Sequence, residues 1–335
     1  MKIFISIASY QDPLLVETLC SAYTNAKYKE NLVFGVCEQS RNGIDLDSLV
    51  FKKQVRYELV DPVMSKGACW ARSRVQHFFK NEDFFLQIDS HTIFTNDWDH
   101  ILLKNYFWIK ESLQENFVIT GYPRAFKPNK DLTSFELDTS SKITWGIALQ
   151  EEKLFEDGHY SGQRSYPSEV SLPLKGYLIA AGFIFSKGDF VKKIPYDSKF
   201  YFHGEELSIA LRLFTNNWAV TYIPEAPLFH FYTDINNLKR KLHWDKEDEE
   251  HRVEKWTQLD KKSKSRLSDL VTNQLNEPYG LGELRSLEEF GEKSGIDLIN
   301  KKILDIKLAT QALSFEKINS SSEPYNEIYS EIKKE

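Results

Sequence analysis

The chain has 335 residues, and 41% of them are hydrophobic. It is therefore long enough to bury a core, either in two modest domains of about 150 residues or in one large domain with an appendage. Acidic residues outnumber basic residues by 49 to 43, which gives a formal net charge of −6. Because non-specific binding to a phosphate backbone requires a positive field, we predict no nucleic-acid partner.

Aromatic residues make up 14% of the chain, and core packing is their commoner use, ahead of stacking on sugars or bases. The three cysteines, Cys20, Cys37 and Cys69, lie inside apolar segments and not at paired spacings, which is typical of reduced residues in an intracellular protein. The apolar start of the chain ends too early for a signal peptide, and no later stretch reaches 18 apolar residues. We therefore predict a soluble, cytoplasmic protein without a transmembrane segment.

The first hundred residues predict strands that alternate with helices. From β-branched and helically spaced runs we expect strands over 3–8, 32–37, 55–60 and 84–88, and helices over 14–22 and 67–79. This alternation is typical of a parallel α/β sheet of the nucleotide-binding type.

The next part of the chain continues the pattern around an irregular segment. We expect a helix over 101–113, a strand over 117–120, an irregular excursion over 125–170, a core segment over 176–185, a helix over 207–214 and a strand over 219–223. Residues 239–267 are dense in charge, which favours a solvated helical face. Two further helices are predicted, over 286–293 and after Pro324, where Tyr325, Ile328, Tyr329 and Ile332 share one face.

Asp89 and His91 follow the apolar strand expected over 84–88. Because side chains two apart on an extended chain point the same way, both project from the carboxyl end of this strand, where ligands collect in open α/β sheets. A carboxylate and an imidazole placed there can bind Mn²⁺ or a similar divalent ion. An Asx turn or a helix cap explains the same residues, so both interpretations stay open.

His230 is the candidate for a third metal ligand, because it is a single histidine within the apolar segment 228–232. A satisfied core histidine is the alternative. The other histidines form no set with metal-ligand spacing, and the chain has neither an HExxH motif nor a cysteine pair for zinc.

Glu205 and Glu206 form an acidic pair between Gly204 and an amphipathic run. Glycine lets the backbone approach a ligand closely, and accessible carboxylates at a helix start can accept hydrogen bonds from sugar hydroxyls or act as a base. The alternative is that they complement the helix dipole. Neither a P-loop nor a GxSxG nucleophile elbow is present.

Six runs in order along the chain together resemble the hydroxyproline-type polypeptide N-acetylglucosaminyltransferase family. The runs are SIASYQDP (6–13), GACWAR (67–72), LQIDSH (86–91), AAGFIF (180–185), GEE (204–206) and PYGLG (278–282). Members of this family are cytoplasmic retaining glycosyltransferases with a GT-A fold, and bacterial relatives exist. The resemblance extends from residue 3 to about residue 297.

The resemblance implies a metal site and a nucleotide site. Asp89 and His91 correspond to a DxH variant of the metal-binding DxD motif, with His230 as the later histidine ligand of Mn²⁺ or Mg²⁺. The residues implied along the uridine and near the nucleotide are Ser9, Tyr10, Asp12 and Arg72. A divalent ion held in this way would neutralise the leaving UDP, a Lewis-acid role that needs no protein nucleophile.

The resemblance also implies that Gly182, Glu205 and Glu206 lie near the donor sugar or the acceptor. His203 departs from the family pattern, in which we expect an aromatic residue before Gly-Glu-Glu. Retention of the α configuration follows from the resemblance, whereas from the residues alone Glu206 could equally be the general base of an inverting enzyme.

The prediction for the whole chain is an α/β protein with a GT-A (Rossmann-like) catalytic domain over residues 1–235 and a helical C-terminal extension over 236–335. Within the catalytic domain, 1–100 form the nucleotide-binding half and 101–235 the half for donor sugar and acceptor. We expect it to transfer GlcNAc from UDP-GlcNAc to a hydroxyl of a glycan or a protein.

Two other classes of function remain open at this point. A metal-dependent hydrolase of sugar nucleotides or phosphodiesters would use the same Asp89, His91 and His230 but needs no acceptor. A non-catalytic carbohydrate-binding protein would use the aromatic side chains alone. Metal-dependent UDP binding together with a requirement for an acceptor distinguishes the transferase from both.

Overall fold

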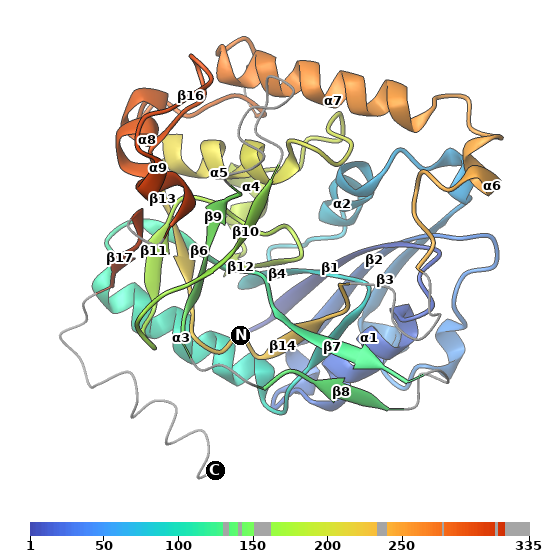
Figure 1. Cartoon of the computed structure of the whole chain (residues 1–335). Coiled ribbons are helices and arrows are strands. Elements are labelled where there is room, and N and C mark those ends of the chain that lie inside the picture. The colour runs from blue at the N-terminus through green and yellow to red at the C-terminus, as the bar shows by residue number, and fades with distance from the viewer. Residues whose placement is uncertain are drawn as a thin grey trace.

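A nine-stranded mixed sheet forms the centre of the molecule in a computed structural model that describes residues 1–129, 134–139, 143–150, 162–232, 240–276, 278–311 and 314–318 (Figure 1). In order across the sheet, its strands are β17 (Glu316–Lys317), β11 (Leu174–Gly176), β13 (Trp218–Tyr222), β6 (Asn116–Thr120), β12 (Phe183–Lys187), β4 (Phe84–Asp89), β1 (Ile3–Tyr10), β2 (Leu32–Gln39) and β3 (Val55–Val60).

The half of this sheet formed by β4, β1, β2 and β3 is parallel throughout. The other half is mixed, because β12 runs antiparallel between β4 and β6, whereas β13 pairs with β6 in parallel. Strands covered on both faces need apolar residues at successive positions. The first five residues of β1 are all buried accordingly, with Phe4 in the core on one face and Ile5 and Ile7 in the core on the other.

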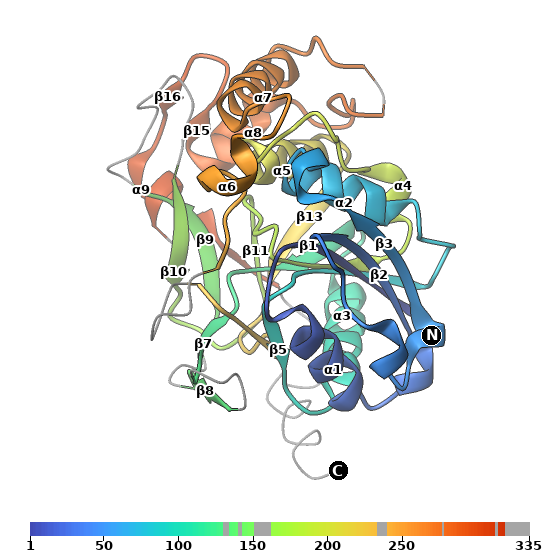
Figure 2. The same cartoon turned by 90° about the vertical axis from the view of Figure 1, so that its right-hand side faces the viewer.

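Helices cover both faces of the sheet (Figures 1 and 2). On one face lie α1 (Leu15–Thr24) and α3 (Trp98–Ser112), and on the other lie α2 (Ala68–Gln76), α4 (Phe190–Lys193) and α5 (Glu205–Thr215). Four short 3₁₀ helices, Lys29–Asn31, Leu46–Ser48, Lys52–Gln54 and Pro62–Met64, occupy the connections around β2 and β3. The predicted α/β class is confirmed.

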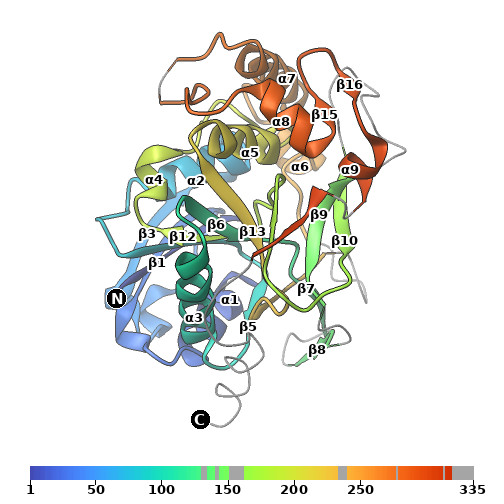
Figure 3. The ribbon, with the colours of Figure 1, turned by 90° about the vertical axis from the view of Figure 1, so that its left-hand side faces the viewer.

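A second, four-stranded sheet lies beside the main one (Figure 3). Its strands, in order, are β5 (Thr92–Phe94), β14 (Leu228–His230), β7 (Arg124–Pro128) and β8 (Phe135–Leu137). Two further strands, β9 (Trp145–Leu149) and β10 (Gln163–Pro167), pair with each other in antiparallel orientation. The expectation of an irregular excursion over 125–170 is therefore wrong for its described residues. Strands of three to five residues are too short to show a period of two, and β10 has no fully buried position.

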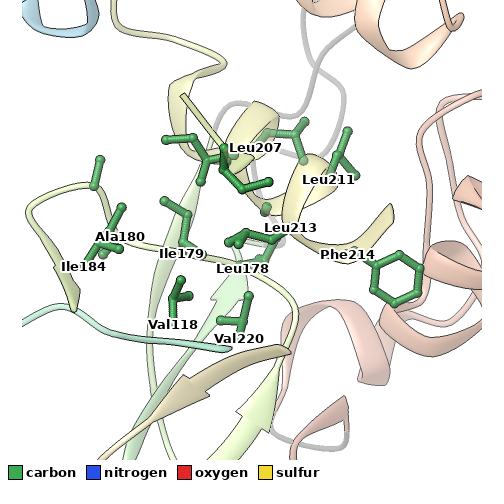
Figure 4. Packing of buried hydrophobic residues seen from close by; sticks show 14 of the residues in the cluster. Val118, Leu178, Ile179, Ala180, Ile184, Leu207, Leu211, Leu213, Phe214 and Val220 are labelled. Atoms are coloured by element: carbon green, nitrogen blue, oxygen red, sulfur yellow. The ribbon is translucent and has the colours of Figure 1, made fainter. Parts of the chain in front are cut away.

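The core between the sheet and α5 is built from side chains distant in the sequence (Figure 4). Leu207, Leu211 and Phe214 recur at helical spacing and belong to the same core cluster as Val118 and Val220 of the sheet. In Figure 4, Phe214 points away from these two valines, toward the C-terminal part. This packing holds the first turn of α5, with its acidic pair, above the carboxyl end of the sheet.

The C-terminal part is mainly helical and continuous with the core. It comprises α6 (Lys246–Glu249), α7 (Trp256–Val271), α8 (Leu287–Ser294), α9 (Ile306–Thr310) and the paired strands β15 (Ile296–Asp297) and β16 (Lys302–Ile303). Phe290 of α8 lies with its ring centroid 5.3 Å from that of Phe214 on α5, and β17 pairs with β11 in the main sheet. The boundary at residues 235/236 stays a prediction, and the helix expected after Pro324 lies outside the described residues.

The solvated face predicted for residues 239–267 is wrong in part. Asp248, Arg252, Ser263 and Leu267 are buried within this run. A charge-rich sequence predicts solvation only where each charge lacks a partner in the fold, and Asp248 and Arg252 both have partners far away in the sequence.

Cys20, Cys37 and Cys69 are all free, and Cys37 and Cys69 are buried whereas Cys20 is half-buried. Among the helices of the described part, none combines the length and apolar character needed to cross a bilayer.

Candidate active site

A cavity of about 710 Å³ opens at the carboxyl ends of β1 and β4. Tyr10, at the end of β1, and Asp89, at the end of β4, both line it. This is the edge at which open α/β sheets bind ligands. Every residue that the sequence predicted for the site, Ser9 excepted, lines this cavity: Tyr10, Asp12, Arg72, Asp89, His91, Gly182, Glu205, Glu206 and His230.

The structure brings together the predicted metal ligands Asp89, His91 and His230. One ligand atom from each lies within 4.8 Å of the others. The Nε2 atom of His230 is 3.0 Å from Oδ2 of Asp89, and Nε2 of His91 is 3.9 Å from the same oxygen. The antiparallel pairing of β14 with β5, which matches His230 to Thr92, carries the distant histidine to this point.

The donor set fits a divalent cation such as Mn²⁺, because one carboxylate and two imidazoles are suitable ligands for it. The Nδ1–H group of His91 donates to Oδ2 of Asp12 at 2.6 Å, which leaves Nε2 facing the other two ligands. Metal-binding histidines usually have such a carboxylate behind them. Gly182 leaves room for the cluster, since a Cβ atom there would lie 2.8 Å from Oδ2 of Asp89.

Arg240 lies against the same cluster. Its Nη1 atom is 2.5 Å from Nε2 of His91, and its Nη2 atom donates to the carbonyl of Tyr232. A metal cation and the guanidinium of Arg240 would compete for the single lone pair on Nε2 of His91. Metal binding at His91 therefore requires Arg240 to move.

Arg72 joins the metal ligands to α5. Its Nη2 atom is 2.5 Å from Oδ1 of Asp89, and its Nη1 atom is 2.5 Å from Oε1 of Glu205. Burial by itself would raise the pKa of Asp89, but the charge of Arg72 and the contacts with both histidines hold that pKa well below its ordinary value. Glu205 is only 4% exposed, so the expectation that both glutamates are accessible is wrong for this side chain.

Glu206 is half-buried and its carboxylate is held on both oxygens. Oε1 accepts a hydrogen bond of 2.9 Å from the backbone N–H of Ala181, and Oε2 accepts one from Nε2 of Gln163. Burial raises the pKa of Glu206 to about 7, and the charge of Glu205 acts in the same direction. A carboxyl group with a pKa near neutrality can gain or lose a proton during a reaction at that pH.

Tyr10, the last residue of β1, lines the cavity. Its hydroxyl donates to Oδ2 of Asp248 at 2.8 Å and accepts a hydrogen bond from Arg252. Ser9, predicted beside it along the uridine, is 1% exposed and belongs to the sheet behind the cavity wall. Asp12 contacts Ser90 and His91, so the structure places it on the metal side of the site.

Exposed aromatic rings lie at the mouth of the cavity. Phe202 is 50% exposed and Trp244 is 39% exposed, with their ring centroids 6.0 Å apart. His203, the position that departs from the family pattern, is also exposed and its Nδ1 atom is 2.9 Å from Oδ1 of Asp260. These rings offer flat apolar faces beside the acidic pair of α5.

The sequence analysis did not single out several residues at or behind the cavity wall, among them Gln163, Arg240, Asp248 and Arg252. Gln163 comes from a segment without periodicity, whereas Arg240, Asp248 and Arg252 come from the run that its charge density marked as solvated. No local signal separates these three from their exposed charged neighbours. Only their distant partners identify them.

A protein-family model described as Glycosyltransferase (GlcNAc) matches residues 41–300 of the chain. No curated protein sequence matches the chain significantly. Solved structures similar to it include S. aureus TarS 1-349, with a TM-score of 0.41 and 13% identity over 68% of this chain and 61% of that one.

Two other solved structures are similar to the chain. GalNAc-T7 with UDP, GalNAc and Mn²⁺ has a TM-score of 0.47 and 12% identity over 87% of this chain and 54% of that one. S. aureus TarS 1-349 in complex with UDP-GlcNAc has a TM-score of 0.42 and 13% identity over 81% and 73% of the two chains. The chain thus spans 61% of the length of S. aureus TarS 1-349 and 54% of the length of GalNAc-T7, which is less than two thirds of each. Since the family model extends over more than half of the chain, we conclude that the chain belongs to the Glycosyltransferase (GlcNAc) family.

Proposed function

We propose that this protein is a metal-dependent glycosyltransferase that moves GlcNAc from UDP-GlcNAc to an acceptor hydroxyl. The observation that carries the proposal is the convergence of Asp89, His91 and His230 within 4.8 Å at the wall of the 710 Å³ cavity. The family match agrees with it.

Asp89, His91 and His230 would hold Mn²⁺ or Mg²⁺, which when bound supplies the positive charge that stabilises a leaving diphosphate. The protein's own groups prepare this site. Asp12 orients His91 through Nδ1, and Arg72 holds one oxygen of Asp89, so that the other oxygen stays directed at the histidines. A preorganised site of this kind lowers the cost of reaching the transition state.

Glu206 is our candidate for the residue that contacts the donor sugar or the acceptor hydroxyl. Its pKa of about 7 and its position on the cavity wall support this role. For Glu205 we propose a role through Arg72, because its carboxylate is paired with that guanidinium. Gly182 serves by leaving space beside Asp89.

The finer assignments rest on the resemblance described above. We propose retention of the α configuration, a relationship to the hydroxyproline-type members of the family, and a hydroxyl of a glycan or a protein as acceptor. A cytoplasmic location is part of the same proposal.

The experiment that tests this function is a donor screen with a mass readout, run with Mn²⁺ or with EDTA over a panel of hydroxyl acceptors. We expect transfer of GlcNAc from UDP-GlcNAc in Mn²⁺ and none in EDTA. Asp89→Asn keeps the size of the side chain and removes its charge, so this variant should be inactive in the same assay. UDP release that continues undiminished without any acceptor would indicate a hydrolase instead.

A further inference from the structure

Asp248 is a fully buried carboxylate outside the cavity wall. It lies in α6, which approaches the carboxyl ends of β1 and β2 from the C-terminal part of the chain (Figure 2). An ionised group at 0% exposure is costly unless hydrogen bonds and opposite charges replace its water. The partners of Asp248 therefore show what the residue holds in place.

All partners from the N-terminal half belong to the ends of β1 and β2. Oδ2 of Asp248 accepts hydrogen bonds from the Tyr10 hydroxyl at 2.8 Å and from Nε2 of Gln11 at 2.5 Å. Oδ1 is 2.5 Å from Nη2 of Arg41, and Nζ of Lys241 lies 3.6 Å from Oδ2. One buried carboxylate thus connects two strand ends to the segment that follows β14.

Arg252 completes the enclosure of the Tyr10 hydroxyl. Its guanidinium is 1% exposed and donates to that hydroxyl, to the carbonyl of Pro62 and to Oε2 of Glu249. The hydroxyl of Tyr10 thus donates to Asp248 and accepts from Arg252. With its hydroxyl engaged on both sides, Tyr10 offers the cavity its ring and no free polar group.

We propose that Asp248 and Arg252 are positioning residues for the nucleotide end of the donor site and act through Tyr10. Neither residue lines the cavity, whereas Tyr10 does. Together they fix the Tyr10 ring as an aromatic wall against which a nucleoside can stack. This inference rests on the proposed function, because it takes the ligand beside Tyr10 to be the uridine diphosphate part of the donor.

A purely structural role predicts a different result from a positioning role. If the network only stabilises the fold, its loss lowers the melting temperature while the folded protein binds UDP normally. If it positions Tyr10, its loss weakens binding of UDP and raises KM for UDP-GlcNAc, whereas kcat at saturating donor changes little, because the reacting atoms lie at the metal and α5.

The test measures UDP binding by calorimetry at saturating Mn²⁺, together with kcat, KM and the melting temperature, for Asp248→Asn, Tyr10→Phe and the double variant. Each single variant should weaken UDP binding by about 10-fold and leave kcat within about 2-fold. The double variant should bind no more weakly than the worse single variant, because both changes break one network. Glu250→Gln is the matched control, since it removes an exposed negative charge two residues from Asp248 and should bind UDP as the wild type does.

The outcomes separate this inference from the proposed function. Unchanged UDP affinity in folded Asp248→Asn and Tyr10→Phe, or strictly additive losses in the double variant, overturns the positioning role while the function stands. A wild-type protein that binds no UDP in Mn²⁺ refutes the proposed function and this inference with it. Should Asp248→Asn fail to fold, Tyr10→Phe decides the question, because it keeps the ring and the Asp248–Arg41 ion pair.

Discussion

Asp12 connects the metal site to the start of α1. Its Oδ1 atom accepts from the backbone N–H of Leu14 at 2.9 Å, and its Oδ2 atom accepts from Ser90 and from Nδ1 of His91. Although burial opposes ionisation, the contact with His91 lowers the pKa of Asp12, so the carboxylate is charged at neutral pH. It can therefore fix the tautomer in which Nε2 of His91 is free to bind a metal.

We predict that Asp12→Asn weakens Mn²⁺ binding by about 10- to 100-fold, the usual cost of losing the carboxylate behind a metal-binding histidine. Calorimetric titration with Mn²⁺ measures the change. Asp61→Asn is a suitable control, because Asp61 caps a backbone N–H of Val63 in the same manner and has no contact with His91. Equal Mn²⁺ affinity in the two variants would contradict the role of Asp12.

Because the pKa of Glu206 is raised in the folded protein, Glu206 makes the stability of the protein depend on pH. Its pKa is about 7 in the folded protein against an ordinary value of 4.5, so the folded state retains the proton at a pH where the unfolded chain has lost it. The contribution of Glu206 to stability is therefore complete below about pH 4.5 and decreases as the pH rises toward 7. The charges of Glu205 and Asp89 raise the pKa of Glu206, whereas the charge of Arg72 lowers it. All three charges remain when Glu206 is replaced by glutamine.

We predict that Glu206→Gln removes this pH dependence. Between pH 5 and pH 8 the melting temperature of the variant should rise relative to that of the wild type, by roughly 2 °C or more. Thermal melts across this range provide the measurement, with Glu292→Gln, an exposed residue on α8, as a control that should follow the wild type. Parallel curves for wild type and Glu206→Gln would show that Glu206 titrates normally.

At the scale of elements, the position of α5 decides where the acidic pair lies. Gly204 precedes this helix with a φ of 89°, a conformation that favours glycine. Helix α7 covers the turn, since Oγ of Ser263 donates to the carbonyl of His203 and accepts from the backbone N–H of Tyr201. The contact between α7 and α5 thus supports the site although α7 comes from the predicted extension.

We predict that Leu270→Ala, on α7, destabilises the whole protein by about 2–5 kcal/mol, the range for removing a buried leucine side chain. Leu270 is 1% exposed and belongs to the same core cluster as Leu211 and Phe214 of α5. A urea or thermal melt measures the loss. Lys261→Ala, at an exposed position of α7, should change little, and an equally small effect of Leu270→Ala would mean that α7 does not pack on the core.

At the scale of the whole molecule, the site joins segments from both ends of the chain. The candidate metal ligands come from β4, the short connection between β4 and β5, and β14, while Asp248 and Arg252 reach the end of β1 from the C-terminal part. A ligand that binds such a site contacts several segments at once. Its binding therefore stabilises the folded state against the unfolded chain.

We predict that UDP and Mn²⁺ together raise the melting temperature and that EDTA reverses the increase. At a free UDP concentration of 100 times its dissociation constant, the stabilisation is about 2.7 kcal/mol, which corresponds to several degrees for a chain of this size. A thermal-shift titration with UDP, in Mn²⁺ and in EDTA, measures it. The same shift in both conditions would contradict a metal-dependent nucleotide site.

Much of the fold could be predicted from the sequence. The strands β1 to β4 and β13 and the helices α1, α2, α3, α5 and α8 lie within a few residues of their predicted ranges. Their apolar residues recur at periods that depend only on local backbone geometry. The short strands β7 to β10 escaped prediction because their stability comes from hydrogen bonds to partner strands and not from a pattern of their own.

The sequence by itself predicted Asp89, His91 and His230 as a metal-ligand set, because the pattern at a strand end and the family resemblance both depend on residue types at known positions, and the three side chains do converge in the structure. Only the tertiary structure decided that Glu205 is buried against Arg72, that Asp12 stands behind His91, and that Asp248 is enclosed at the end of β1. The physical reason is that the burial and the partners of a charged side chain depend on which distant segments meet around it. A charged residue has the same local sequence signal whether water or a buried partner surrounds it.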